Sequence, residues 1–190
     1  AGRRPNTDDL GLATIGLETE RDGTLWTDGC LRTRVRGVWA AGDIRGGPMF
    51  TQTAWDDSRI LISQLVGDGT RTTARIVPWA VYTDPQLGRV GLSEEEARRR
   101  GIRVSVGRFA MSKNGKARET GEPEGFVKVL VDPKTKKLLG ATVLAADGAE
   151  LVHVFVTLMN AGARVSALRD AIVIHPTLAE ALQSAAAVLS

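Results

Sequence analysis

The pattern of hydrophobic and polar positions changes character at a stretch of small and polar residues, Gly67 to Arg75. Its composition is typical of a linker, because it offers few apolar side chains to bury and several residues that favour turns. The order of the predicted elements also differs on its two sides. We therefore expect two domains, residues 1–70 and residues 71–190.

The first part carries short apolar runs between turn residues, and its elements become clear only towards its end. A short buried strand is predicted at Gly37–Asp43, where Val38, Trp39 and Ala40 follow one another. A helix is predicted from about Thr51 to Val66, with Gly67 as its stop signal. We expect this helix to turn the side chains of Ala54, Ile60, Leu61 and Leu65 towards a core.

The second part alternates between strand-like and helical patterns. Ser93 and Glu96 form a capping box at the start of one helix, and Asp132–Lys136 is typical of a hairpin turn. The whole part predicts an α+β fold, an antiparallel sheet with helices packed on it. The predicted strands are 76–82, 87–92, 103–110, 126–131 and 138–145, and the predicted helices are 93–101, 149–160, 166–170 and 177 to the end.

Composition and charge argue against several classes of function. No run approaches the roughly 18 apolar residues of a membrane span, and the first residues lack the apolar core of a signal peptide, so we expect a cytoplasmic protein without a membrane partner. The 25 basic and 22 acidic residues are interspersed, which leaves no basic face for nucleic acid. The single cysteine, Cys30, excludes an internal disulfide and any cysteine-based zinc site. With only two histidines besides it, we expect no metal site.

Gly42 and Asp43 are the first candidates for chemistry. An acid next to a glycine, at the carboxyl end of a strand and before a helix, is placed where α/β sheets bind ligands. The glycine allows a ligand to approach the backbone, and the carboxylate can accept hydrogen bonds from sugar hydroxyls. On pattern alone, a plain turn in which Asp43 caps the next segment explains these residues as well.

His175 and Glu180 are the second candidates, within His175-Pro176-Thr177-Leu178-Ala179-Glu180. Thr177 and Glu180 form a capping-box pattern that needs no further explanation. A bend at Pro176 would also bring the imidazole and the carboxylate together, so that the acid orients the ring and raises its basicity. The two interpretations are compatible.

Several short motifs occur in an order and at a spacing that resemble one enzyme family. The resemblance is to the C-terminal region of the pyridine nucleotide–disulfide oxidoreductases, which include dihydrolipoamide dehydrogenase, glutathione reductase and mercuric reductase, and it covers essentially the whole chain. The motifs are Gly2-Arg3-Arg4-Pro5-Asn6, Leu31-Arg32-Thr33, Val38–Asp43, Asp84–Ser93, Gly125–Lys128, Leu139-Gly140-Ala141, Ala149-Glu150-Leu151 and His175–Glu180.

The resemblance implies a fold and a role for each candidate. Residues 1–70 would be the C-terminal segment of an FAD-binding domain, and residues 71–190 a dimerisation domain that forms a homodimer. His175, after which a cis bond to Pro176 is expected, would act as general acid/base in the partner's active site, and Glu180 would orient it. Asp43 would bind the ribityl hydroxyls of FAD, and the isoalloxazine would lie along Gly42, Met49, Phe50 and Thr51.

In such enzymes NADH or NADPH reduces FAD, FAD reduces a cysteine pair, and the thiols reduce a small-molecule disulfide or a metal ion. The family's glycine-rich FAD motif, its Cys-x4-Cys pair and its nicotinamide-binding motif belong before Arg3, and none occurs in this sequence. We therefore expect the chain to contribute to the reaction without performing it alone. The alternative is a non-catalytic dimerisation or binding module of the same fold.

Overall fold

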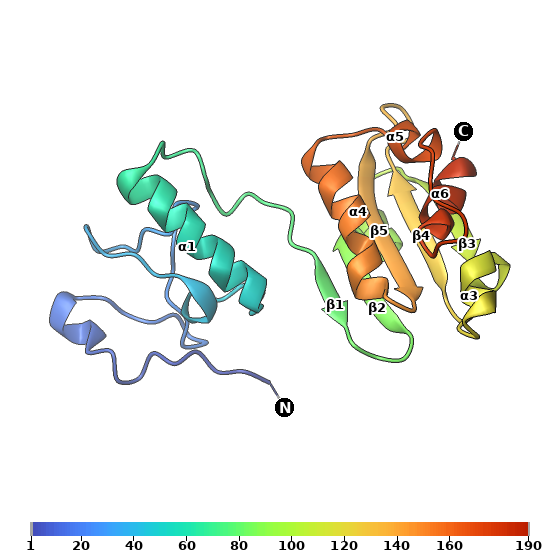
Figure 1. The fold of residues 1–190 in the computed structure, drawn as a ribbon. Coiled ribbons are helices and arrows are strands. Elements are labelled where there is room, and N and C mark those ends of the chain that lie inside the picture. The colour runs from blue at the N-terminus through green and yellow to red at the C-terminus, as the bar shows by residue number, and fades with distance from the viewer. Residues whose placement is uncertain (1, 190) are drawn as a thin grey trace. The chain divides into compact units, whose positions relative to one another are not determined.

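The structure, a computed structural model, describes residues 2–189 and divides into two compact units between Arg75 and Ile76 (Figure 1). Each unit has its own hydrophobic core. No helix among residues 2–189 is long and apolar enough to cross a membrane.

The first unit contains one long helix, α1 (Thr51–Val66), and two short 3-10 helices, η1 (Leu12–Ile15) and η2 (Gly42–Arg45). The bounds of α1 confirm the predicted helix. The predicted strand at Gly37–Asp43 is wrong, because this segment forms only an isolated bridge between Trp39 and Arg32. A strand needs a neighbour along its length, and the described part of this unit offers it a single residue. The small core consists of Leu17, Leu25 and Ala40, with Leu12, Val35, Val38 and Ile44 packed against it.

The buried face of α1 differs from the predicted one. Of the four residues expected to face a core, only Ile60 is fully buried, and Leu65 is exposed. The other buried positions are the polar residues Thr53, Asp57 and Ser63. Because a charged residue is rarely buried in a helix without partners, the position of Asp57 calls for a specific explanation.

The second unit is built on a five-stranded antiparallel sheet in the order β1-β2-β5-β4-β3, which confirms the predicted fold class (Figure 1). The central pair, β4 and β5, joins through a turn in which the Asp132 carboxylate accepts from the backbone N–H groups of Lys134 and Thr135. The strands are β1 (Trp79–Val81), β2 (Gln86–Gly91), β3 (Ser105–Ala110), β4 (Phe126–Val131) and β5 (Leu138–Ala145).

Helices pack on this sheet and complete its core. Helix α4 contacts β2 and β5, and α6 contacts β3 and β4. The core between them includes Val129, Val143, Phe155 and Leu182, all with 0% of their surface exposed. The helices are α2 (Glu94–Arg99), α3 (Gly115–Glu119), α4 (Gly148–Asn160), α5 (Ser166–Arg169) and α6 (Glu180–Ala187), with a 3-10 helix η3 (Met111–Lys113) before α3.

The start of α6 is later than predicted. The Thr177 hydroxyl donates to the carbonyl of Ile174, at 2.8 Å, and does not cap a helix beginning at its own position. Half of the predicted capping box forms, because the Glu180 carboxylate accepts from the Thr177 N–H at 2.8 Å. The helix consequently begins at Glu180 and ends at Ala187, short of the chain end.

Candidate functional site

The predicted flavin-binding residues lie in the first unit, around the η2 turn. Gly42 has a φ of 73°, which favours glycine, and a Cβ at this position would lie 3.5 Å from the Ala54 side chain. Asp43 follows it, with 47% of its side chain exposed. Among the described residues its carboxylate has one ionic partner, Arg3, at 3.7 Å. The turn therefore presents a largely free carboxylate beside a backbone without a side chain.

Met49, Phe50 and Thr51 lie at the start of α1. The Arg3 guanidinium, which faces Asp43, also donates to the carbonyl of Met49, so one side chain links the two predicted groups of residues. Phe50 is the N-cap residue, and its carbonyl accepts from the N–H groups of Thr53 and Ala54 at 3.0 and 3.1 Å. The N-terminus of α1 carries the partial positive charge of a helix end.

Asp57 is a residue of this site that the sequence analysis missed. Its side chain is 1% exposed, and its two carboxylate oxygens accept four hydrogen bonds. The donors are the Gly42 N–H at 2.8 Å, Arg45 Nε at 2.6 Å, Arg45 Nη2 at 3.0 Å and Arg75 Nη2 at 2.6 Å. The helical spacing of Asp57 with Thr53 and Ile60 was the available signal, since it places an acid on the buried face of α1.

The environment of Asp57 keeps it ionised. Burial raises the pKa of the carboxyl, but the hydrogen bonds from Arg45, Gly42 and Arg75 outweigh that effect, and the pKa ends below its ordinary value of 3.8. The carboxylate therefore remains a permanent acceptor for the backbone of the η2 turn at neutral pH.

His175 and Glu180 lie in the second unit, and the structure brings them together. The imidazole Nδ1 is 2.9 Å from Glu180 Oε1, and the His175–Pro176 bond is cis. The second carboxylate oxygen accepts from the Thr177 N–H, which fixes the acid at the start of α6. Because a carboxylate only accepts hydrogen bonds, Nδ1 carries the proton in this contact, and Nε2 is the ring nitrogen that does not take part in it.

The pair shifts the two pKa values in opposite directions. The hydrogen bond that His175 donates to Glu180, followed by the charge of that carboxylate, raises the pKa of His175 above the ordinary 6.5. The backbone hydrogen bond from Thr177, followed by that from His175, lowers the pKa of Glu180 below 4.5. Both shifts favour an imidazolium–carboxylate pair.

The imidazole of His175 faces away from the core of its own unit. Its side chain is 77% exposed, and its neighbours in the chain, Ile172 and Ile174, expose large apolar side chains as well. Exposed apolar residues beside a polar group are typical of a surface that another protein chain covers.

Asn114 supports the histidine segment from the side and was also missed in the sequence analysis. It is buried, its Oδ1 accepts from the Ala117 N–H at 2.9 Å and caps α3, and its Nδ2 donates to the Thr177 carbonyl at 3.1 Å. One side chain therefore connects α3 to the backbone between His175 and Glu180. The sequence gives no signal for this, because 63 residues separate Asn114 from Thr177.

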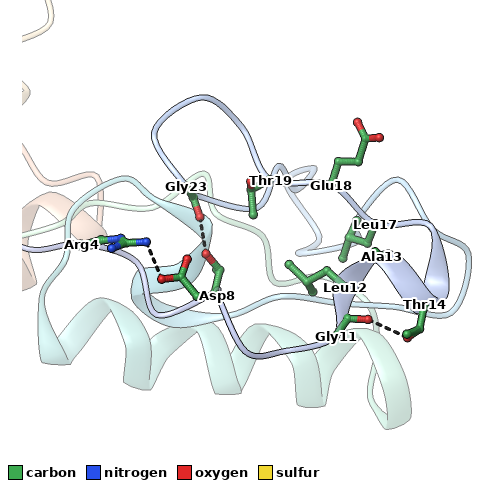
Figure 2. Close-up of a pocket in the computed structure, with 11 residues that line it drawn as sticks. Arg4, Asp8, Gly11, Leu12, Ala13, Thr14, Leu17, Glu18, Thr19 and Gly23 are labelled. Atoms are coloured by element: carbon green, nitrogen blue, oxygen red, sulfur yellow. Dashed lines mark hydrogen bonds and ion pairs between the residues drawn. The ribbon is translucent and has the colours of Figure 1, made fainter.

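The first unit contains a hollow of about 590 Å³, lined by residues between Arg4 and Gly23. Figure 2 shows these lining residues. Arg4 and Asp8 point towards each other in it and form an ion pair. Its lining includes neither Asp43 nor residues 49–51. The hollow is therefore distinct from the candidate flavin-binding turn.

Comparison with known proteins identifies the fold and the order of the two parts. Residues 77–186 match the pyridine nucleotide-disulphide oxidoreductase dimerisation domain, and residues 1–58 match a pyridine nucleotide-disulphide oxidoreductase domain. The chain belongs to the pyridine nucleotide-disulphide oxidoreductase family. The family resemblance is thereby confirmed, and the second unit contains the family's dimerisation domain.

Relatives of this chain come from bacteria, archaea and a plant. It is 36% identical over 184 residues to the probable pyridine nucleotide-disulfide oxidoreductase RclA of Escherichia coli strain K12, which covers 96% of the chain and 42% of the relative. It is 38% identical over 185 residues to a dihydrolipoyl dehydrogenase of Halobacterium salinarum, covering 97% of the chain and 39% of the relative. The chain thus spans about two fifths of the length of these relatives.

Solved structures of relatives match the whole chain as well. The HOCl-induced flavoprotein disulfide reductase RclA from Escherichia coli superposes with a TM-score of 0.93 at 35% identity, over 100% of this chain and 44% of its own. LpdA from Mycobacterium tuberculosis superposes with a TM-score of 0.94 at 26% identity, over 100% of this chain and 41% of its own. Two relatives with different names therefore share this arrangement of elements.

Proposed function

We propose that this chain is the C-terminal part of an FAD-dependent NAD(P)H oxidoreductase that reduces a small-molecule disulfide or a metal ion as a homodimer. The observation that carries the proposal is the His175–Glu180 pair, 2.9 Å apart and exposed on the dimerisation domain of a redox family. A histidine with a carboxylate on one ring nitrogen and solvent on the other is built to take up and release a proton.

The acid/base role belongs to Nε2 of His175. In the proposed dimer this atom faces the redox thiols of the partner subunit, takes a proton from a thiol as it attacks and returns it to the leaving thiol. Glu180 holds Nδ1–H, keeps the ring in one orientation and stabilises the imidazolium that forms. The exposed Ile172 and Ile174 would be covered by the partner, which excludes water from the pair.

The residues of the first unit suit a flavin. Gly42 leaves room where a side chain would stand, and the half-exposed Asp43 carboxylate has acceptor capacity left for ribityl hydroxyls. Met49, Phe50 and Thr51 would border the isoalloxazine at the N-terminus of α1. FAD, when bound, supplies two-electron transfer between the nicotinamide and the disulfide.

The test uses the complete gene product that contains this chain, purified and assayed for NADH and NADPH oxidation with a panel of small disulfides and metal ions. We expect visible flavin absorption and turnover with at least one acceptor. His175→Gln should slow the reaction with a disulfide by roughly 10²–10⁴-fold, the usual contribution of a positioned acid/base. His153→Gln is the matched control, because His153 is the other histidine and is also exposed, on α4.

Two results would contradict the proposal. A complete gene product without flavin absorption would exclude the flavoenzyme. A His175→Gln variant that is as active as the His153→Gln control would remove the acid/base role and favour the non-catalytic dimerisation module.

A further inference from the structure

We propose that Asp57 is a positioning residue for flavin binding, which holds the Gly42–Asp43 turn in the shape that presents the Asp43 carboxylate to the ribityl chain. This inference rests on the proposed function, in which Asp43 binds FAD. Asp57 itself is fully buried, with 0% of its surface exposed.

The contacts of Asp57 lock both ends of the η2 turn. Oδ2 accepts from the backbone N–H of Gly42, the first residue of the turn, at 2.8 Å. The same oxygen and Oδ1 accept from the guanidinium of Arg45, the last residue of the turn, at 2.6 and 3.0 Å. Asp43 lies between these two anchored residues, so its backbone cannot rotate without breaking bonds to a buried carboxylate.

Arg75 completes this site and attaches it to the end of the first unit. Its Nη2 donates to Asp57 Oδ1 at 2.6 Å and to the Thr53 carbonyl at 3.3 Å. Two guanidinium groups thus balance one buried carboxylate, and its roughly four acceptor positions are all used. A buried ion pair adds little net stability compared with apolar packing. The four hydrogen bonds to Asp57, however, hold the η2 turn in one geometry, which an apolar side chain at this position could not do.

Asp56 provides a matched control on the same helix. It carries the same carboxylate, is 24% exposed, and forms ion pairs with Arg59 at 3.2 Å, with Arg75 at 2.6 Å and with Arg71 at 3.9 Å. None of these partners belongs to the η2 turn. A loss of charge at Asp56 therefore disturbs the arginines of the network without releasing Gly42.

The decisive experiment measures FAD affinity in the complete flavoprotein. The apoprotein is titrated with FAD and followed by flavin fluorescence, for Asp57→Asn, Asp56→Asn, Asp43→Asn and the Asp43→Asn/Asp57→Asn double variant. We expect Asp57→Asn to weaken binding by about tenfold or more, because the amide cannot balance two arginines and keep all four bonds. Asp56→Asn should stay within about twofold of the parent.

The double variant distinguishes positioning from a general loss of structure. If Asp57 acts through Asp43, the double variant should bind FAD about as weakly as Asp43→Asn alone, since coupled residues are not additive. An Asp57→Asn variant with parental affinity would overturn the inference. So would a double variant in which the two losses multiply.

A second measurement is independent of FAD and uses the 190-residue chain. The Gly42 amide should exchange slowly with solvent in the parent and in Asp56→Asn, and markedly faster in Asp57→Asn, as seen by NMR. Equal exchange in all three would overturn the inference.

Arg45→Lys is the alternative variant if Asp57→Asn does not fold. It keeps the positive charge and removes one of the two hydrogen bonds from Arg45 to Asp57. An unchanged FAD affinity in Arg45→Lys would count against the inference.

Failure of the proposed function gives a different pattern. A complete gene product that binds no FAD contradicts the flavoenzyme, while the exchange of the Gly42 amide still decides whether Asp57 holds the turn.

Discussion

A single added methyl group at Gly107 should separate α6 from the sheet and disturb the His175–Glu180 pair. Gly107 lies in β3, directly beneath α6, and a Cβ there would lie 2.1 Å from the Ala185 carbonyl oxygen and 2.9 Å from two side-chain carbons of Leu189. Ordinary contacts begin near 3.4 Å. The helix must therefore retreat by about 1 Å, because the obstacle is backbone and cannot rotate away.

The magnitude follows from the packing of α6. Four of its eight residues are buried, with Ala181, Leu182, Ala185 and Ala186 each 0% exposed. Overpacking of such a contact costs roughly 1–3 kcal/mol. With a urea m-value of about 2 kcal/mol/M, Gly107→Ala should lower the unfolding midpoint by about 1 M. Since α6 begins at Glu180, the retreat also draws the carboxylate away from the imidazole.

The assay is urea unfolding of the 190-residue chain followed by far-UV circular dichroism. All variants are compared at one protein concentration, because the proposed dimerisation would contribute to stability. Gly115→Ala is the matched control. A Cβ at Gly115 would meet nothing within 4 Å, its φ is not positive, and it lies in α3, so alanine should be neutral or stabilise by up to about 1 kcal/mol. Equal midpoints for Gly107→Ala and the parent would refute the reasoning, because α6 would then not rest on β3.

Three further predictions concern the second unit. The pKa of the His175 ring, measured by NMR, should lie above 6.5 and return towards 6.5 in Glu180→Gln. The stability that the raised pKa adds to the folded state is complete below pH 6.5 and is lost as the pH rises through the raised value. Identical titrations of the two proteins would contradict the pairing. Asn114→Asp keeps the acceptor that caps α3 but loses the donor to Thr177, so it should lower the free energy of unfolding by about 1 kcal/mol. Asn114→Ala should lower it further, because the cap is also lost. Equal unfolding midpoints for the two variants would argue against a double role. The 190-residue chain should sediment as a dimer. Ile174→Glu should weaken this dimer, because Ile174 is 78% exposed beside His175. A stable monomer of the parent chain at micromolar concentration would count against this interface.

Sequence patterns confined to a few neighbouring residues were sufficient to predict many of the helices and strands. The sequence alone predicted the bounds of α1, β4 and β5, because hydrophobic period and stop residues are local properties. The capping box at Ser93 also forms as predicted. The five-residue spacing of His175 and Glu180 and the proline between them predicted a contact that the structure contains.

Tertiary structure decided what depends on partners distant in the chain. The strand predicted at residues 37–43 failed because an extended segment becomes a strand only where another strand pairs with it along its length. The hydrogen bonds of Asp57 could not be predicted from local pattern, because its donors lie 12 to 18 residues away. Asn114 was hidden for the same reason, at a separation of 63 residues. Local pattern specifies where the chain is helical or extended, whereas the burial of a polar group and the choice of its partners are set only when distant segments pack together.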